Sequence, residues 1–522
     1  MRKSQLPFGI ALPKDFQLKD FQWILILTVA AIALWTINLG NVPLRDWDEG
    51  YYAVVARGMI DNHQWLYPTR FGAPYFPKPP FGYWLGSLGY LAFQQVNEFT
   101  TRLPMALTTA LGVPLLYSLV RLLSPYRREA VLTAGVYMML LPVVRQGRLH
   151  MFDGFINTLL ILLLLCLLKS AKSRRWAFGM GLCLAAIALT KGILAIALGG
   201  IAAVFAVLDR RWALFKNPYT WLGLAVGLSL TVGWNVAQYQ RYGDVFVQEH
   251  LGFHNLARIS STLENHDGPP WYYLLEILKY CFPWVLFWPG GLWLAWRSRH
   301  STRGRLVLTG TVLFLSMASA MGTKLPWYVM PIYPFVALAV GWQLSRPVQP
   351  YAYSLRWIFG ISAAVGIGGI VYFVIADPQL PLLLLGACLT ITLGQVSRQL
   401  SQKEPNFVNT LLIGFYSCLM LLMISHSWIW ELNEAFPVVN VGRMVAANVP
   451  SGETVYSSFE YGRPSLEFYA EHPVGVADDE TLQQHRQNGH YLLLEPDALE
   501  ALQILPTAVI ETVDGFSLVE PP

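Results

Sequence analysis

The chain has 522 residues, of which 54% are hydrophobic and 13% are charged. Soluble domains carry about 25% charged residues, so this composition excludes an ordinary soluble protein and predicts a polytopic α-helical membrane protein. The net charge of +5 is unevenly spread, because residues 431–522 contain three arginines, no lysines and fifteen acidic residues. The basic excess therefore lies in the apolar part, where it is typical of cytoplasmic loops and lipid contact, and it does not predict nucleic-acid binding.

Apolar runs long enough to cross a hydrocarbon layer of about 30 Å recur from residue 21 to residue 430. The first run is long and lacks a small-residue cleavage site, which predicts a retained span rather than a signal peptide. We predict thirteen spans, at 21–40, 102–122, 129–145, 154–169, 176–190, 192–208, 219–239, 279–296, 306–321, 326–344, 354–375, 379–397 and 407–430.

Lysine and arginine gather in alternate connections between these spans, beginning with the N-terminal segment. Because cytoplasmic loops hold the excess of basic residues, the pattern predicts a cytoplasmic N-terminus and a periplasmic or extracellular C-terminal tail. We therefore expect an integral protein of a bacterial inner or plasma membrane.

Three segments outside the spans are long enough to carry structure. Residues 41–101 and 240–278 are predicted outer loops, and the first contains two stretches with helical apolar spacing, EGYYAVVARGMI and FGYWLGSLGYLAF, which read as interfacial helices. Residues 431–522 alternate short β-rich runs with helix-like stretches, which predicts a small α/β domain. The expected organisation is a transmembrane catalytic module, 1–430, followed by an extracytoplasmic α/β domain, 431–522.

Polar residues gather at the ends of spans on the predicted outer face, where a charged group is costly and function is the default interpretation. The candidates are Asp48, Glu49, Lys78, Asp153, Lys191 and Lys324. Carboxylates and lysines on one face suit a site that binds an anion and activates a hydroxyl. Plainer alternatives stay open: the acidic residues as helix caps, and Lys78 and Lys324 as headgroup anchors.

Lys191 interrupts about thirty apolar residues in ALTKGILA, so it predicts a turn between two spans. His254 and His266 lie in the loop 240–278 and are candidates for metal or acceptor contact, although two spaced histidines are equally consistent with structural roles. No GxxxxGK[ST] loop, GxGxxG motif or GxSxG elbow is present, so the sequence gives no support to nucleotide binding or serine hydrolysis.

Several motifs follow one another along residues 20–345: DWDEGYYAVVARGM, PYFPKPPFGYW, FDGF, LTKG, HNLARI with HDGPPWYY, and KLPWYVMPIYP. In this order they resemble the motifs of bacterial GT-C glycosyltransferases. The nearest group is the protein mannosyltransferase-like membrane enzymes, which include the aminoarabinose transferase that modifies lipid A.

The resemblance implies a GT-C fold and transfer of a sugar, with inversion, from a polyprenyl phosphate to an extracytoplasmic lipid, glycan or protein. Asp48 matches the first-loop carboxylate and Asp153 the second acidic position, with Glu49 as a further catalytic candidate. The implied donor contacts are Lys78, Lys191, Arg258 and Lys324 for the phosphate, and Tyr75 and Tyr328 for the rest of the donor pocket. No cofactor is established, and participation of a divalent metal is left open.

Two other classes of function stay open on the sequence. A transporter or flippase for a lipid-linked sugar would be favoured by polar residues deep within several spans and by inverted repeats, neither of which is apparent. A polysaccharide ligase or polymerase of related architecture would use a similar donor carrier. An inactive binding scaffold is the least favoured interpretation.

Overall fold

The computed structural model describes residues 19–257, 261, 266–346, 353–376, 378–429 and 438–522. The chain divides into two compact units. The helical unit comprises Met1–Asn38, Ala106–Arg148 and Phe152–Trp428, and the mixed unit comprises Leu39–Met105, Leu149–Met151 and Ile429–Pro522.

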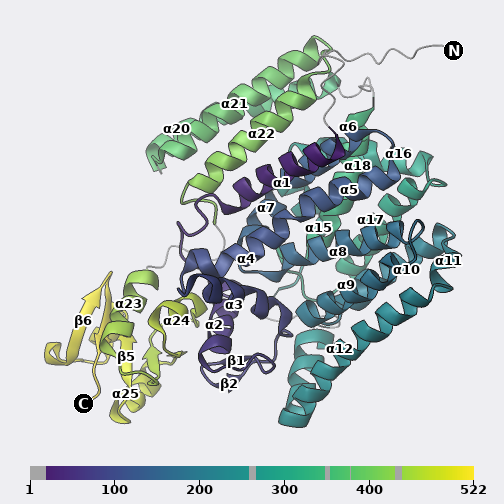
Figure 1. Cartoon of the computed structure of the whole chain (residues 1–522). Helices are drawn as coiled ribbons and strands as arrows, with labels where there is room; N and C mark the ends of the chain where they lie inside the picture. Colours follow the sequence, from purple (N-terminus) through teal and green to yellow (C-terminus); the bar gives the residue numbers. More distant parts are fainter. Residues whose placement is uncertain (1–18, 258–260, 262–265, 347–352, 377, 430–437) are drawn as a thin grey trace, which may run out of the picture. The chain divides into compact units, whose positions relative to one another are not determined.

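Nearly all of the described part of the helical unit is helix (Figure 1). Its elements are α1 Asp20–Thr36, α5 Gly112–Leu123, α6 Arg127–Met138, α7 Leu141–Arg148, α8 Phe152–Lys169, α9 Trp176–Lys191, α10 Leu194–Leu208, α11 Trp212–Phe215, α12 Pro218–Tyr242, α13 Asp244–Phe246, η1 Val247–Ala257, α15 Tyr272–Tyr280, η2 Trp284–Phe287, α16 Trp288–Arg297, α17 Thr302–Ala320, η3 Pro326–Ile332, α18 Tyr333–Ser345, α20 Arg356–Ala376, α21 Leu380–Ser401 and α22 Phe407–Ile424. Helix α4, Glu98–Ala110, begins in the mixed unit and ends in the helical unit.

Among the described residues, seven helices are long and apolar enough to cross a membrane, and eight if α6 and α7, bent by 58° at their junction, form one span. The apolar helices α1, α9 and α10 are shorter. These helices confirm an integral membrane protein, whereas the count of thirteen spans stays a prediction.

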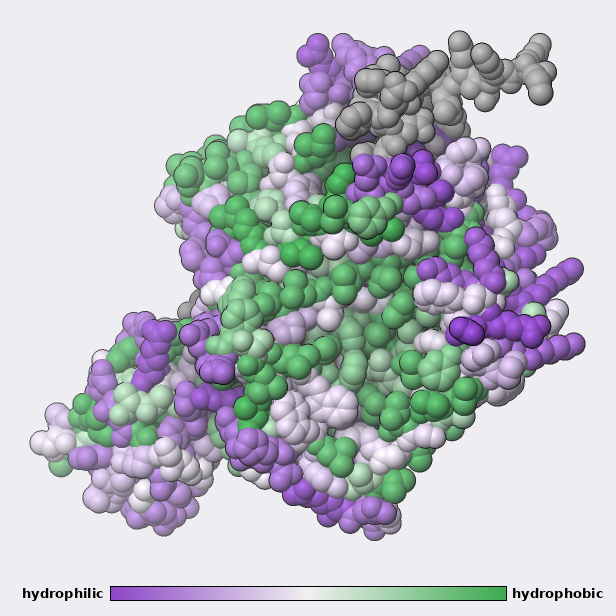
Figure 2. Space-filling view, viewed as in Figure 1, coloured by the Kyte–Doolittle hydropathy of each residue, from purple (hydrophilic) through white to green (hydrophobic). Residues whose placement is uncertain are grey.

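Large apolar side chains are exposed along several of these helices. Trp221 of α12, Val365 of α20 and Ile413 of α22 are 58%, 69% and 71% exposed. Figure 2 shows hydrophobic side chains over much of the visible surface of the helical unit. Such surfaces are unfavourable in water, so they are the faces that contact lipid tails.

Helices α8 and α18 lie inside the helical unit, where most of their residues are buried. Helix α8 packs against α5 and α9, and α18 packs against α6 and α16. Glycines allow the closest approaches: a Cβ on Gly181 of α9 would lie 2.0 Å from the carbonyl carbon of Gly223 in α12. This is the small-residue contact typical of membrane helices.

The mixed unit joins the first long loop to the C-terminal region. The loop forms α2 Asp48–Asp61, the hairpin strands β1 Thr69–Arg70 and β2 Ala73–Pro74, and α3 Phe81–Phe93. Helices α2 and α3 occupy the two stretches predicted as interfacial helices.

The C-terminal region, the domain formed by residues 438–522, confirms the predicted small α/β fold. Its elements are α23 Val438–Asn448, β3 Val455–Ser457, α24 Pro464–Ala470, β4 Val474–Val476, α25 Asp479–Gln487, β5 Tyr491–Leu494, α26 Pro496–Ala501, η4 Pro506–Ala508, β6 Val509–Val513 and β7 Phe516–Val519. The sheet order is β4-β3-β5-β7-β6, with β3 parallel to β4 and β5, and β7 antiparallel to β5 and β6. Alternate residues of β5 face opposite sides, Leu493 toward α23 and α24 and Leu492 toward α25 and α26.

Candidate active site

Glu49 is completely buried in the first turn of α2 and is fully engaged by hydrogen bonds. Its carboxylate accepts from Arg102 Nε at 2.8 Å and Nη2 at 2.9 Å, and from the backbone N–H groups of Arg45 at 2.7 Å and His150 at 2.9 Å. Burial alone would raise the pKa of Glu49, but the Arg102 charge and these hydrogen bonds outweigh it and hold the pKa below its ordinary value. A carboxylate in this setting holds structure, and the catalytic role predicted for Glu49 stays a prediction.

Arg102 extends this network to the chain that precedes α2. Its guanidinium also donates to the carbonyls of Leu39, Val42 and Pro43, at 3.1, 2.8 and 2.7 Å. Arg102 is the first residue of the span predicted at 102–122, and this structural role was not predicted. Its position near the polar end of an apolar run was the only signal, and that signal is shared by many snorkelling arginines.

Asp48 differs from its neighbour Glu49 in being half-buried. It lies in the first turn of α2, where the helix dipole favours a carboxylate. The pKa of Tyr83, a completely buried residue of α3, is raised mainly by burial and further by electrostatic interaction with Tyr75 and Asp48.

Aromatic rings bring the Lys-Pro element to the start of α2. The Tyr75 ring lies 6.1 Å from the Tyr51 ring and 6.3 Å from the Tyr83 ring, measured between centroids. Tyr51 is one helical turn after Asp48, and Tyr75 is three residues before the half-buried Lys78. Two motifs separated by about thirty residues thus lie in one part of the mixed unit, which includes the predicted residues Asp48, Tyr75 and Lys78.

In the helical unit, the structure pairs Asp153 with Lys191. Asp153 lies in the first turn of α8, Lys191 is the last residue of α9, and Lys191 Nζ is 2.6 Å from Asp153 Oδ1. The side chains are 5% and 11% exposed, respectively. The helix break predicted at Lys191 is confirmed, because α9 ends there and α10 begins at Leu194.

Two further motifs meet the others at this ion pair. Lys191 Nζ lies 5.9 Å from the centre of the Tyr328 ring in η3, which places KLPWY beside LTKG. At Gly192 a Cβ would lie 2.8 Å from Asn255 Oδ1, which places Asn255 of the HNLARI motif there as well. Four segments spread over some 175 residues therefore converge on Asp153, Lys191 and Tyr328, and this convergence is the strongest structural support for a functional site.

Lys324 lies at the turn before η3 and is mostly buried. Its Nζ donates to the Met321 carbonyl at 2.6 Å, and its backbone N–H donates to the His266 carbonyl at 2.9 Å. A Cβ on Gly268 would lie 3.1 Å from Lys324 Cδ, so the HDGPPWYY motif packs against KLPWY.

Of the predicted metal or acceptor contacts, His254 lies in η1, and the His266 carbonyl accepts from the Lys324 backbone N–H. His254 Nε2 is 3.9 Å from Glu249 Oε2, a distance at the limit of an ion pair. The described residues contain no group of three or more His, Cys, Asp or Glu side chains that would hold a metal ion. Arg258, a predicted phosphate contact, lies outside the described residues.

Two arginines of the RQGRLHMFDGF stretch have structural partners. Arg148 donates to the Leu34 and Ile37 carbonyls at the end of α1, at 2.9 and 2.7 Å, and lies over the Trp428 ring. Arg145 donates to the Trp428 carbonyl at 3.0 Å. Both arginines satisfy carbonyls that a helix end or a chain turn leaves without backbone partners.

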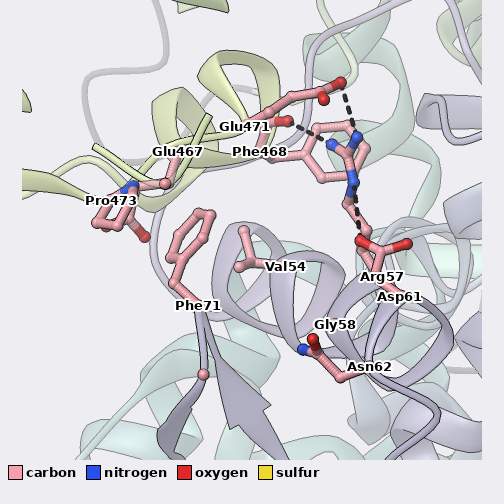
Figure 3. Close-up of a pocket in the computed structure, with 12 residues that line it drawn as sticks. Val54, Arg57, Gly58, Asp61, Asn62, Phe71, Glu467, Phe468, Glu471 and Pro473 are labelled. Atoms are coloured by element: carbon pink, nitrogen blue, oxygen red, sulfur yellow. Dashed lines mark hydrogen bonds and ion pairs between the residues drawn. The ribbon is translucent and has the colours of Figure 1, made fainter. Parts of the chain in front are cut away.

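A cavity of about 380 Å³ lies between α2, α24 and the β1–β2 hairpin of the mixed unit (Figure 3). Arg57 crosses one side, 2.7 Å from Glu471 and 3.6 Å from Asp61. On another side Glu467 accepts from Arg70, and burial raises the pKa of Glu467 although the guanidinium opposes this. Each lining carboxylate is paired with an arginine: Asp61 and Glu471 with Arg57, and Glu467 with Arg70 of β1.

Taken together, the apolar helices, the long first loop and the C-terminal α/β domain define a polytopic membrane protein of the GT-C class, as the motifs predicted. Residues 77–235 match the family model described as dolichyl-phosphate-mannose-protein mannosyltransferase. Among solved structures, ArnT from Cupriavidus metallidurans bound to undecaprenyl phosphate has a TM-score of 0.77 at 20% identity, covering 96% of this chain and 98% of that one. The chain therefore has the GT-C fold.

Relatives in sequence agree with this assignment. The undecaprenyl phosphate-alpha-4-amino-4-deoxy-L-arabinose arabinosyl transferase of Edwardsiella ictaluri is 30% identical over 355 residues, which are 66% of this chain and 63% of that protein. A protein of the same name from Pseudomonas fluorescens is 29% identical, over 68% of this chain and 67% of its own length. The chain thus matches a little under two thirds of the length of the Edwardsiella relative. It is similar to the aminoarabinose transferases among GT-C glycosyltransferases.

The archaeal oligosaccharyltransferase AglB from Archaeoglobus fulgidus, in complex with an inhibitory peptide and a dolichol-phosphate, is a more distant structural neighbour. Its TM-score is 0.53 at 13% identity, covering 92% of this chain and 70% of that one. This likeness concerns the fold alone.

Proposed function

We propose that this protein is a membrane glycosyltransferase that moves a sugar from a polyprenyl phosphate to an acceptor on the extracytoplasmic side. The convergence of four motif segments on the Asp153–Lys191 ion pair carries the proposal. The similarity to arabinosyl transferases and the GT-C fold support it. A lipid-linked donor fits such a site because nucleotide sugars are confined to the cytoplasm, whereas a polyprenyl chain keeps its sugar at the membrane surface.

In the proposed reaction an acceptor oxygen attacks the anomeric carbon of the donor sugar. The bond from that carbon to the phosphate oxygen breaks, the electron pair leaves with the polyprenyl phosphate, and the hydroxyl proton passes to the carboxylate of Asp48. A single displacement inverts the anomeric configuration.

Cations have the second role, because negative charge grows on the departing phosphate. Lys191 and Lys324 of the helical unit, with Lys78 and Arg258, are the proposed contacts for that charge. One preorganised donor of this kind contributes about 3–4 kcal/mol to transition-state stabilisation. Asp153 orients Lys191 through their ion pair and helps to position the acceptor, and Tyr75 and Tyr328 complete the proposed donor pocket.

The proposed donor carries an undecaprenyl or dolichyl chain, and the names of the relatives make 4-amino-4-deoxy-L-arabinose the first sugar to test. The proposed acceptor is a lipid of the lipid A type, with glycan and protein acceptors as further choices. We also propose a cytoplasmic N-terminus, a catalytic module in residues 1–430 and an extracytoplasmic domain in residues 431–522, supported by the loop charges.

The test uses detergent-purified wild type, Asp48→Asn and a matched control, Asp61→Asn, which changes a more exposed carboxylate at the other end of α2. Each protein is given a panel of polyprenyl-phosphate sugars and a membrane extract, and release of polyprenyl phosphate is measured. We expect release by wild type and Asp61→Asn, and a loss of about 100-fold or more in Asp48→Asn with donor binding retained. Donor binding without release by wild type, across the panel, would contradict the proposal and favour transport.

A further inference from the structure

The backbone immediately before Asp48 has a conformation that its own sequence does not favour. Trp47 has φ +68° and ψ −123°. In this left-handed region the Cβ of an ordinary residue meets its own backbone, so such residues keep this conformation only where their surroundings impose it. Whatever holds Trp47 therefore also sets the direction in which α2 begins and in which Asp48 projects.

The contacts that hold this turn come from the C-terminal domain. The Asp46 carboxylate is 5% exposed and accepts from the Ser465 backbone N–H at 3.1 Å, from the Ser465 hydroxyl and from Arg463 Nη1 at 3.2 Å. The Trp47 ring stacks on the Tyr461 ring, with centroids 5.7 Å apart and planes 18° from parallel. Both residues that precede Asp48 are thus fixed by residues some 415 positions later in the chain.

The contact continues into the first turn of α2. A Cβ on Gly50 would lie 2.6 Å from the Ser465 nitrogen and 2.7 Å from the Pro464 carbonyl carbon, so the beginnings of α2 and α24 touch through their backbones. Arg463 ties the two contacts together, because it lies 5.0 Å from the centre of the Tyr461 ring and donates to the Tyr461 hydroxyl at 3.3 Å. Asp48 therefore lies between Asp46 and Trp47, which contact residues 461–465, and Gly50, which contacts Pro464 and Ser465.

Helix α2 and the α24 region make a second contact far from Asp48. This distal contact serves as a control for the contact beside Asp48. Arg57 of α2 is paired with Glu471, beyond the end of α24, and donates to the Phe468 carbonyl beside the cavity (Figure 3). Arg57 is nine positions after Asp48, about 13 Å along a helix. Breaking this distal contact weakens the union of α2 and α24 without touching the turn at Trp47.

We infer that Tyr461, Arg463 and Ser465 are positioning residues for Asp48, so that the C-terminal domain supplies part of the catalytic geometry. The inference rests on the proposed function. The position of α24 fixes Asp46 and Trp47 through these contacts, and Asp46 and Trp47 in turn fix the Asp48 carboxylate. A displacement of about 1 Å at such a group lowers the rate by up to about 100-fold without a comparable change in binding.

The experiment compares Tyr461→Ala, Tyr461→Phe, Ser465→Ala and the distal control Glu471→Gln, each with the full chain in detergent and a polyprenyl-phosphate sugar that wild type turns over. We expect Tyr461→Ala and Ser465→Ala to lower kcat about 10- to 100-fold while the donor KM changes less than about twofold. Tyr461→Phe keeps the stacked ring, and Glu471→Gln leaves the turn intact, so both should stay within about threefold of wild type.

A second set of variants combines Ser465→Ala and Tyr461→Ala with Asp48→Asn. An effect that acts by positioning the Asp48 carboxylate should disappear there, because that carboxylate has been removed. We expect less than about twofold further loss of the residual rate. Equal losses in both backgrounds, or equal losses in Glu471→Gln and Tyr461→Ala, would overturn the inference and leave a merely structural contact. If Ser465→Ala fails to fold, the Tyr461 pair decides. If wild type releases no polyprenyl phosphate, the proposed function fails first and the inference with it.

Discussion

The Glu49–Arg102 and Asp153–Lys191 ion pairs begin from the same chemistry. Each has a carboxylate in the first turn of a helix, α2 or α8, and a cation that comes from a different helix. The difference lies in what surrounds them. Glu49 and Arg102 are 0% exposed and share their remaining hydrogen bonds with backbone groups, whereas Asp153 and Lys191 keep some exposure and lie beside Tyr328 and Asn255.

This difference separates two uses of a buried charge pair. A pair enclosed by backbone donors and carbonyls specifies the path of the chain, because any change of path would leave a charge without partners. A pair with one partly exposed member, here Lys191 at 11% exposure beside Tyr328, can exchange its partner for a substrate. Glu49 and Arg102 therefore hold the loop before α2, and we propose that Asp153 and Lys191 take part in the reaction.

The largest effect on stability is expected from Arg102→Met. It leaves the Glu49 carboxylate buried without its countercharge, and the carbonyls of Leu39, Val42 and Pro43 lose a donor. We expect the free energy of unfolding to fall by about 3–5 kcal/mol, measured by thermal or denaturant unfolding in detergent. A loss below about 1 kcal/mol would remove the distinction between the two pairs.

A smaller effect is expected on the pH dependence of stability. The pKa of Glu49 in the folded protein is below its ordinary value of 4.5. Its charge therefore stabilises the fold above about pH 4.5, and this contribution is lost as the pH falls toward the folded pKa. The difference in Tm between wild type and Glu49→Gln should be constant from pH 7 to about pH 5.5 and should shrink below pH 4.5. A difference that grows on acidification would contradict this sign.

The smallest effect is expected from Arg57→Met. The Arg57 and Glu471 side chains are 22% and 57% exposed, so solvent screens their attraction. We expect the free energy of unfolding to change by less than about 1 kcal/mol, measured in parallel with Arg102→Met. A loss as large as that of Arg102→Met would mean that solvent exposure does not separate these pairs.

Much of the helical unit could be predicted from the sequence, because long apolar runs with basic flanks leave few alternatives in lipid. Lys191 is the clearest example, because one charge within about thirty apolar residues marked the turn that the structure has. The 58° bend between α6 and α7 was missed, because residues 129–145 are mostly apolar and were predicted as one span although Pro142, the second residue of α7, lies at the break. Strand β6 was also missed, because VIETV follows a turn and alternates only weakly.

The candidate site was harder to predict, because its assignments depend on partners far away in the chain. Asp48 and Glu49 are adjacent and chemically alike, and only the contact with Arg102 separates a structural carboxylate from a half-buried one. Asp153 and Lys191 were both identified, but their ion pair was not, since it depends on the packing of α8 against α9. The contact of Asp46 and Trp47 with residues 461–465 likewise has no signal in sequence spacing.

The most direct test measures the affinity of purified Lys191→Met, Asp153→Asn and wild type for undecaprenyl phosphate, with Arg57→Met as the control. If Lys191 binds the phosphate and Asp153 competes for the same ammonium group, the two substitutions should act in opposite directions. We expect Lys191→Met to bind about tenfold more weakly, and Asp153→Asn more tightly than wild type although its transfer is slower. Unchanged affinity in both variants would contradict the account and return the Asp153–Lys191 pair to a structural role.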